Sequence, residues 1–343
     1  MKYILTLLGS LVQYSIFACD FCGCFMGITP YDNQSSISVL YRYKSYSGYY
    51  GAGQGSLLFP NAHRSYQPNG GQGYFDKQLK HGSHTVVSDS ALSPRDYELF
   101  TSAELRGKFF IHPRIELNAV IPFVMNQSRV NEQKQAIQGL GDLTFFAAYH
   151  VVSKIMTEKY QHRLIIGAGL KLPVGDYYQK DASGQRIDYM LQPGTGSVDY
   201  LAYLNYVFGV KKFGLNFNTM FKNNGENYYH ERVDNSTATY LNVFYKIRQE
   251  KDLKFFPSIQ GFYEYTKGVY IHETFQNGTT MNVLTAGIGL DVFYKNMALN
   301  TSFHLPAYEQ GFDKNLKHSA KFMLGLTYNF NQKKYLFRRK QND

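Results

Sequence analysis

All three cysteines of the 343-residue chain lie in one short segment, Cys19-Asp20-Phe21-Cys22-Gly23-Cys24. Thiolates at such close spacing can converge on one soft metal ion such as Cu(I), and the thioether of Met26 is near enough to join them. An odd number of clustered cysteines cannot build a disulfide framework for the rest of the chain. The segment therefore predicts a site for copper or another soft metal at Cys19, Cys22 and Cys24.

Two other interpretations of this segment stay open. Cys19 follows Ile16-Phe17-Ala18, which partly resembles the signal for lipidation of an N-terminal cysteine, although Phe17 is bulky for that signal. Alternatively, Cys19 and Cys22 form a disulfide, or all three residues remain plain thiols in a flexible segment.

Enzymatic chemistry has no recognisable basis in the sequence. The Gly-rich stretches between residues 47 and 95 lack the strand, helix and Lys-Ser/Thr of a phosphate-binding loop. Neither a Gly-x-Ser-x-Gly elbow nor a His-Glu-x-x-His motif occurs. We therefore predict that the protein is not an enzyme. A membrane protease or lipase, whose site would assemble from separate strands, is the remaining enzymatic alternative.

The N-terminus predicts export. Residues 1–18 combine Lys2, an apolar stretch and the small residue Ala18 at a plausible cleavage point, which is typical of a secretory signal peptide. Residues 19–35 then form a segment that carries the cysteines and is expected in the periplasm.

The elements that follow have a hydrophobic period of two, which is typical of β-strands. In 284–294, Leu, Ala, Ile, Val and Tyr alternate with Thr, Gly and Asp, and in 213–222, Phe and Leu alternate with Gly, Asn and Lys. One face of each strand is thus apolar and the other polar. A membrane barrel turns such an apolar face to lipid and the polar face to its lumen.

Strand length and loop asymmetry favour the barrel over a soluble sandwich. We predict about twelve strands, and most match or exceed the roughly 9–11 residues that a tilted strand needs to cross a bilayer. The expected ranges are 36–46, 96–111, 114–126, 140–153, 161–174, 196–209, 212–222, 236–249, 252–265, 281–294, 297–306 and 318–330. Long connections alternate with short ones, as in outer-membrane proteins. The prediction is an all-β, antiparallel, up-and-down barrel over 36–330 in the outer membrane of a Gram-negative bacterium, with both termini periplasmic.

Composition agrees with this placement. The chain has 30 Tyr, 26 Phe and no Trp, yet its mean hydropathy is only −0.35. A lipid-facing band with Tyr at its borders accounts for the aromatics, while a polar lumen lowers the mean. The net charge of +10 is spread over strands, turns and the basic tail 331–343. No nucleic-acid-binding motif accompanies it, so we expect membrane lipid, not nucleic acid, as a partner.

Alternation also predicts which polar residues line the lumen. Either they form a charged network that fills a narrow barrel, or they line a path for a solute. The residues are Glu98, Glu104, Arg106, Lys108, Glu116, Arg163, Lys171, Asn216, Asn218, Lys222, Asn242, Lys246, Arg248, Glu264, Asp291 and Lys321.

Three local motifs occur in order in the middle of the chain: Gly139-Leu140-Gly141-Asp142, Leu172-Pro173-Val174-Gly175, and Leu191-Gln192-Pro193-Gly194-Thr195-Gly196-Ser197. This set resembles the outer-membrane transporters grouped with the phenol meta-degradation pathway protein. The Cys-Asp-x-Cys-Gly-Cys start resembles a variant found in exported barrels of Bacteroidota. The resemblance covers chiefly residues 139–200 and implies transport without naming a substrate.

The sequence thus predicts an outer-membrane channel for small solutes, with hydrophobic or aromatic compounds as candidates. One alternative is a metal-handling barrel that captures copper through the cysteine segment. The other is a structural or adhesion barrel that acts through its surface loops. The oligomeric state is left open.

Overall fold

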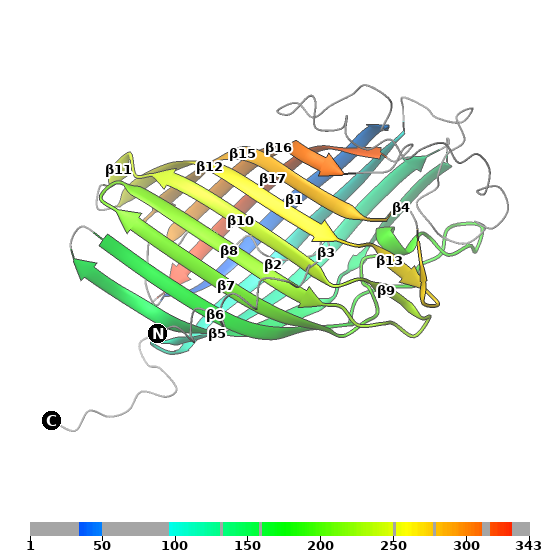
Figure 1. The fold of residues 1–343 in the computed structure, drawn as a ribbon, viewed down its shortest axis with the longest axis horizontal. Helices are drawn as coiled ribbons and strands as arrows, with labels where there is room; N and C mark the ends of the chain where they lie inside the picture. The colour runs from blue at the N-terminus through cyan, green and yellow to red at the C-terminus, as the bar shows by residue number, and fades with distance from the viewer. Residues whose placement is uncertain are drawn as a thin grey trace, which may run out of the picture.

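Twelve strands form one closed antiparallel barrel in the computed structural model (Figure 1). The structure describes residues 34–49, 96–130, 133–157, 160–249, 252–276, 279–310 and 316–330. The barrel strands are β1 (Ser35–Tyr49), β2 (Tyr97–His112), β3 (Ile115–Val130), β5 (Leu143–Thr157), β6 (Tyr160–Leu172), β7 (Asp199–Val210), β8 (Phe213–Asn223), β10 (Ser236–Tyr245), β12 (Leu253–Thr266), β15 (Met281–Tyr294), β16 (Met297–Gln310) and β17 (Leu316–Phe330).

Each barrel strand pairs with its neighbours in chain order, and the first strand pairs with the last. β1 and β17 run antiparallel with Ser35 opposite Phe330. β10 and β12 pair as well, so the sheet has no open edge. Closure satisfies the backbone hydrogen bonds of every barrel strand, as a lipid environment requires. The predicted all-β, closed antiparallel barrel of twelve strands is confirmed, and the periplasmic position of the termini stays a prediction.

Short and long connections lie at opposite ends of the barrel (Figure 1). Tight turns join β2 to β3, β7 to β8 and β15 to β16 at the short-turn end, which is also where β1 begins and β17 ends. The opposite end carries the longer connections. Among the described residues, no helix is long and apolar enough to cross a membrane.

Several connections predicted as loops contain strands instead. The expected loop 127–139 is largely a hairpin, because β3 continues to Val130 and β4 (Gln133–Leu140) folds back along it. Within the expected loops 223–235 and 266–280, β9 (Glu231–Val233), β13 (Val269–Ile271) and β14 (Thr274–Phe275) form a separate three-stranded sheet. The predicted strand 236–249 is shorter than expected, because β10 ends at Tyr245 and β11 (Arg248–Gln249) is a short addition beside β12.

A cap built from three connections covers the long-loop end. It comprises residues 173–198, which include the short 3-10 helix η2 (Tyr189–Leu191), and the segments 224–235 and 267–276, which carry β9, β13 and β14. Tyr189, Val233 and Val269 pack together in a small apolar core that joins all three connections. The cap is therefore a packed unit that rests on the barrel.

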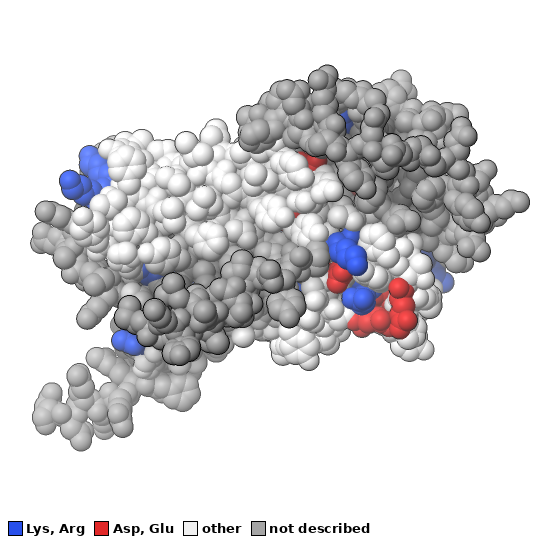
Figure 2. Space-filling view, in the orientation of Figure 1, with Lys and Arg blue, Asp and Glu red and all other residues white. Residues whose placement is uncertain are grey.

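The barrel's outer surface is apolar. Outward positions hold large exposed hydrophobic residues on strand after strand, among them Ile37, Leu117, Ile166, Ile259, Ile288 and Leu326. On the face drawn in Figure 2, the coloured charges lie toward the two ends, and the described surface visible between them is uncharged. Such a band matches the lipid-facing belt of a membrane barrel.

Candidate functional site in the barrel interior

Asp142 lies where the three sequence motifs meet. It precedes β5, and one carboxylate oxygen accepts a hydrogen bond from the Gly175 amide at 3.2 Å. The other oxygen accepts from the Thr195 amide at 2.8 Å and the Thr195 hydroxyl at 2.9 Å. The ammonium of Lys171 lies 2.9 Å from the same oxygen. Motifs that are distant in the sequence thus share one buried carboxylate.

The glycines of these motifs allow the close approach. A Cβ on Gly175 would lie 2.6 Å from the carbonyl carbon of Gly141, and one on Gly194 would lie 2.7 Å from the Asp142 carboxylate. Gly196 adopts a φ of +73°, a conformation that side chains rarely tolerate. Packing and turn geometry therefore explain these glycines.

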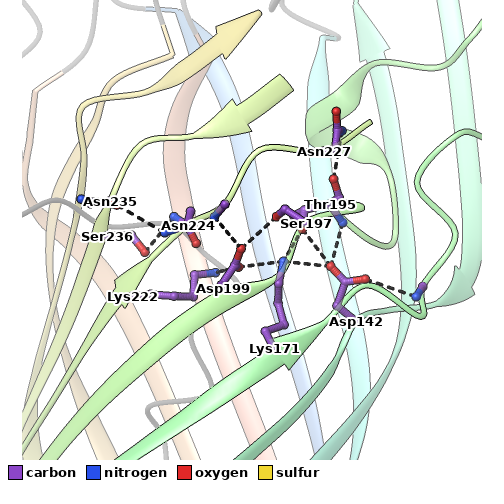
Figure 3. A network of polar contacts seen from close by, with 12 residues as sticks. Asp142, Lys171, Thr195, Ser197, Asp199, Lys222, Asn224, Asn227, Asn235 and Ser236 are labelled. Atoms are coloured by element: carbon purple, nitrogen blue, oxygen red, sulfur yellow. Dashed lines mark hydrogen bonds and ion pairs between the residues drawn. The ribbon is translucent and has the colours of Figure 1, made fainter. Parts of the chain in front are cut away.

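A ladder of alternating charges continues from Asp142 along the wall (Figure 3). Lys171 at the end of β6 lies 2.8 Å from Asp199 at the start of β7, and Lys222 at the end of β8 lies 3.6 Å from Asp199. Asp199 also accepts hydrogen bonds from the Ser197 hydroxyl at 2.8 Å and the Gly225 amide at 3.1 Å. We call Asp142, Lys171, Asp199 and Lys222 the charge ladder.

Two further charged groups lie inside the barrel. Arg42 on β1 and Arg106 on β2 both contact Glu104, with nitrogen–oxygen distances of 3.0 and 2.5 Å. Lys44 on β1 and Lys321 on β17 both contact one oxygen of Glu264 on β12, at 3.5 and 3.3 Å. In each of these groups, two basic side chains share one carboxylate.

A cavity that is partly open to solvent lies between these groups. The charge ladder contributes Asp142, Lys171 and Lys222 to its lining, and Pro193 and Thr195 of the cap also line it. Asn126 on β3 anchors this part of the cap by donating a hydrogen bond to the carbonyl of Leu191 at 2.9 Å. The cap thus forms part of the cavity's boundary.

An apolar cluster adjoins the cavity inside the barrel. It comprises Leu40, Phe146, Ala148, Ile165, Leu201, Tyr203, Met220, Ala238, Tyr240, Phe262 and Met323. These residues come from eight strands and contact one another, so the cluster reaches across the interior from wall to wall. Phe146, Leu201 and Met220 belong both to the cluster and to the cavity lining.

Sequence reasoning missed this cluster. It assigned apolar residues to the lipid face, yet Met220, Tyr240 and Phe262 are buried in the interior. Their register could have revealed them, because each lies on the same strand face as predicted lumen residues. Met220, for example, falls between Asn218 and Lys222.

Arg186 joins two of the three connections of the cap. Arg186 donates to both carboxylate oxygens of Glu231, one of them at 2.8 Å, and to the carbonyl of Tyr177 at 3.0 Å. Its guanidinium also stacks on the rings of Tyr178 and Tyr229, which stack on each other with centroids 4.4 Å apart. Desolvation and the neighbouring phenol of Tyr178 raise the pKa of Tyr229 above its usual value.

The structure buries most of the predicted lumen residues: Glu104, Arg106, Glu116, Lys171, Asn216, Asn218, Lys222, Asn242, Glu264, Asp291 and Lys321. Glu98, Lys108 and Arg163 are half-buried on β2 and β6. Lys246 is half-buried but follows the end of β10, and Arg248 lies in β11.

These residues fall into separate groups. Glu116 contacts His150 at 3.1 Å and Asp291 accepts a hydrogen bond from Asn300 at 2.6 Å, both away from the cavity lining. Lys171, Lys222 and Lys321 are brought together around the cavity.

Other predictions fall outside the described residues. They include the signal peptide 1–18, the cysteine segment with Cys19, Cys22 and Cys24, most of the connection 47–95, and the basic tail 331–343. Copper binding by the cysteines therefore stays a prediction. Within the described ranges, no group of three or more His, Cys, Asp and Glu side chains is arranged to hold a metal ion.

Comparison with solved structures identifies the class of barrel. An outer membrane channel from Pseudomonas putida F1 superposes with a TM-score of 0.59 at 14% identity, covering 89% of this chain and 100% of that one. The protein is a Gram-negative outer-membrane β-barrel. At this identity, the likeness concerns the fold alone.

Two other outer-membrane barrels match more loosely. The β-domain of the Bordetella autotransporter BrkA has a TM-score of 0.43 at 12% identity, covering 87% of this chain and 100% of its own. The toluene transporter TbuX of Ralstonia pickettii has a TM-score of 0.35 at 8% identity, with 89% and 90% covered. Neither superposes closely enough to support a functional inference.

No protein-family model and no curated protein matches the sequence. The resemblance to the phenol meta-degradation transporters therefore stays a prediction.

Proposed function

We propose that this outer-membrane barrel is a channel for small solutes, with the cap on the cell surface and the short-turn end in the periplasm. The observation that carries the proposal is the cavity under the cap. At this level the interior has a cavity that is bounded by charged and apolar side chains from several strands. A barrel with a purely structural role has no need for such a cavity.

The apolar cluster is the narrow part of the proposed path. It adjoins the cavity, and its members are packed against one another from opposite walls. A solute must pass this cluster to reach the short-turn end, so the channel admits small molecules and conducts ions weakly. Apolar walls favour solutes that carry a hydrophobic or aromatic body, because such a body loses little on leaving water.

Planar-bilayer recording of the purified full-length protein tests this proposal. We expect small, discrete conductance steps for the native chain. Phe262→Ala removes an aromatic ring from the cluster and is expected to increase the conductance at least about twofold, because truncating Phe to Ala opens a cavity. Phe262 is only 2% exposed, and it lies inside the barrel.

Tyr263→Ala provides the matched control. Tyr263 is the next residue on the same strand but points outward and is 36% exposed, so its truncation should leave conductance unchanged. Heat-modifiable migration on a gel verifies that each variant is folded. Folded native and Phe262→Ala proteins that both lack conductance would refute the channel.

A further inference from the structure

Two histidines of the cap lie opposite each other at one end of the β9–β13 pair. The paired residues there are Glu231 and Ile271, and the amide of His272 donates a hydrogen bond to the carbonyl of His230 at 2.8 Å. The centroids of the two imidazole rings are 5.8 Å apart, and both side chains are exposed. Two separate connections of the cap therefore bring their imidazoles to one place.

Local structure fixes the position of both histidines. His272 and Glu273 form the two-residue turn between β13 and β14, with φ angles of +46° and +61°. His230 has a φ of +56° and closes a turn in which its amide donates to the carbonyl of Asn227 at 3.1 Å. Glycine adopts such angles with less strain than a residue with a side chain. The turns alone therefore do not account for a histidine at each position.

A carboxylate sets the tautomer of one imidazole. The Nδ1 atom of His230 lies 2.5 Å from a carboxylate oxygen of Glu226. An ionised carboxylate can only accept a hydrogen bond, so the proton of the neutral ring is on Nδ1 and the lone pair is on Nε2. Histidines that bind metals commonly have such a carboxylate on their second nitrogen, where it orients the ring and raises its basicity. Glu226 thus prepares Nε2 of His230 as a ligand atom.

The separation of the rings fits one shared metal ion. An imidazole nitrogen lies about 2 Å from a bound Zn²⁺, so two rings that share the ion have their centroids about 5–6 Å apart. Imidazole suits Zn²⁺, Ni²⁺ and Cu²⁺, whereas Mg²⁺ prefers oxygen ligands. The described residues contain no group of three or more His, Cys, Asp and Glu that could hold a metal, so water completes the coordination of an ion held by this pair.

The charges around the histidines favour a cation. Arg232, the basic residue of β9, lies 3.6 Å from Asp234, which balances its charge. Glu226 and Glu273 add two further carboxylates in the two turns that carry the histidines. The local charge is therefore negative and attracts a divalent cation.

We propose that His230 and His272 bind one divalent transition-metal ion such as Zn²⁺ or Ni²⁺, and that Glu226 is a positioning residue for His230. The ion joins the connection 224–235 to the connection 267–276 and so restrains the cap. The site is separate from the predicted cysteine site, and it does not depend on the channel function.

Hydrogen exchange of the full-length protein, folded in detergent and followed by mass spectrometry, tests the site with Zn²⁺, Ni²⁺ and Mg²⁺. Exchange is measured segment by segment, so an ion bound by the cysteines does not interfere. An ion at about a hundred times its dissociation constant makes an opening that separates the two histidines about a hundredfold rarer. We expect exchange in 227–234 and 269–276 to slow at least about tenfold with Zn²⁺ or Ni²⁺, and not with Mg²⁺. Equal slowing by Mg²⁺, or no slowing by Zn²⁺ and Ni²⁺, would overturn the proposal.

A pair of variants locates the site. His272→Asn removes one ligand but keeps a residue that tolerates the positive φ of the turn, and it should abolish the slowing by Zn²⁺. His112→Asn is the matched control at the short-turn end. The Nδ1 atom of His112 accepts a hydrogen bond from the amide of Arg114 at 3.1 Å, which the Asn side chain can also accept, so this variant should respond to Zn²⁺ like the native protein. Slowing that persists in His272→Asn, or is lost in both variants, refutes the site.

Glu226→Gln tests the positioning role. The variant keeps both histidines and removes the negative charge from the partner of His230, so the Zn²⁺ concentration that gives half of the slowing should rise about tenfold or more. Exchange without metal should stay at the native rate, which a merely structural role for Glu226 would change. A native response of Glu226→Gln to Zn²⁺ would contradict the role given to Glu226. If His272→Asn loosens the cap without metal, the comparison of Zn²⁺ with Mg²⁺ on the native protein still decides.

Discussion

Asp199 is the residue on which the charge ladder depends. It is 1% exposed and lies between Lys171 and Lys222, and it also holds the Ser197 hydroxyl and the Gly225 amide. Because Asp199 is buried, water cannot take its place in balancing the charges of Lys171 and Lys222. Removing one partner from a buried ion pair is costly because the other charge stays buried.

Asp199→Asn should destabilise the barrel by about 3–5 kcal/mol, as measured by urea unfolding in lipid vesicles. The amide keeps the shape of the side chain but leaves Lys171 and Lys222 without its charge. Asp181→Asn, in an exposed turn of the cap where Asp181 bonds only to its neighbours, is the control and should have little effect. Equal stability of the Asp199→Asn and native proteins would contradict the role given to the ladder.

At the residue scale, the sequence predicts on which strand face a charged residue lies better than it predicts which residue that charge contacts. Alternation predicts Lys171, Lys222 and Lys321 on the polar faces of their strands, because a period of two fixes the face directly, and all three are buried. It could not reveal that Lys321 shares Glu264 with Lys44, because Lys44 lies on β1, which is brought beside β17 only through closure of the barrel. Long-range pairing of this kind leaves no local trace.

The cap shows how elements without strong local signals arise. β9, β13 and β14 have only two or three residues each, too few to display an alternating pattern. They form because the connections that carry them are brought together and joined by Arg186, Glu231 and a small apolar core. The barrel strands, in contrast, are long enough for their period to be recognised, and their predicted ranges agree closely with the structure.

Arg186→Ala should loosen the cap without unfolding the barrel. The change removes both hydrogen bonds to Glu231 and the stacking on Tyr178 and Tyr229. Hydrogen exchange of residues 186–195 should accelerate at least about tenfold, because hydrogen bonds to charged groups contribute about 1.5–3 kcal/mol. Mass spectrometry of the exchanged protein measures this.

Lys180→Ala is the matched control for Arg186. Lys180 is an exposed basic residue of the same connection, and its ammonium lies over Tyr178 at 5.7 Å. Its removal should leave exchange in 186–195 unchanged. If both variants exchange at the native rate, Arg186 does not hold the cap.

Across the described barrel strands, large apolar residues cover the outer surface, and buried charged residues line the interior beside the apolar cluster. Ile259 and Ile288 face each other across β12 and β15 and are 73% and 67% exposed. A soluble protein would bury such a pair, whereas lipid is the medium in which it is stable. An apolar outer surface around a polar interior explains why the chain is rich in aromatic residues and yet has a low mean hydropathy.

Ile288→Arg tests the belt directly. Ile288 lies near the middle of β15, so the arginine should destabilise the barrel by about 2–4 kcal/mol in lipid vesicles. Tyr228→Arg introduces the same residue at an 82% exposed position of the cap and should be close to neutral. Equal unfolding curves for the two variants would place the belt outside the bilayer.

The pairing of β1 with β17 has a consequence for how the protein forms. Ser35 and Phe330 are neighbours in space but lie almost a full chain length apart in the sequence. The entropic cost of closing so long a loop grows only logarithmically with its length, whereas the folding rate falls steeply with such distant contacts. Until β17 arrives, β1 and β16 each expose a strand edge that invites pairing with other chains. Membrane insertion therefore competes with aggregation during assembly. The barrel can close only after β17 has reached the membrane.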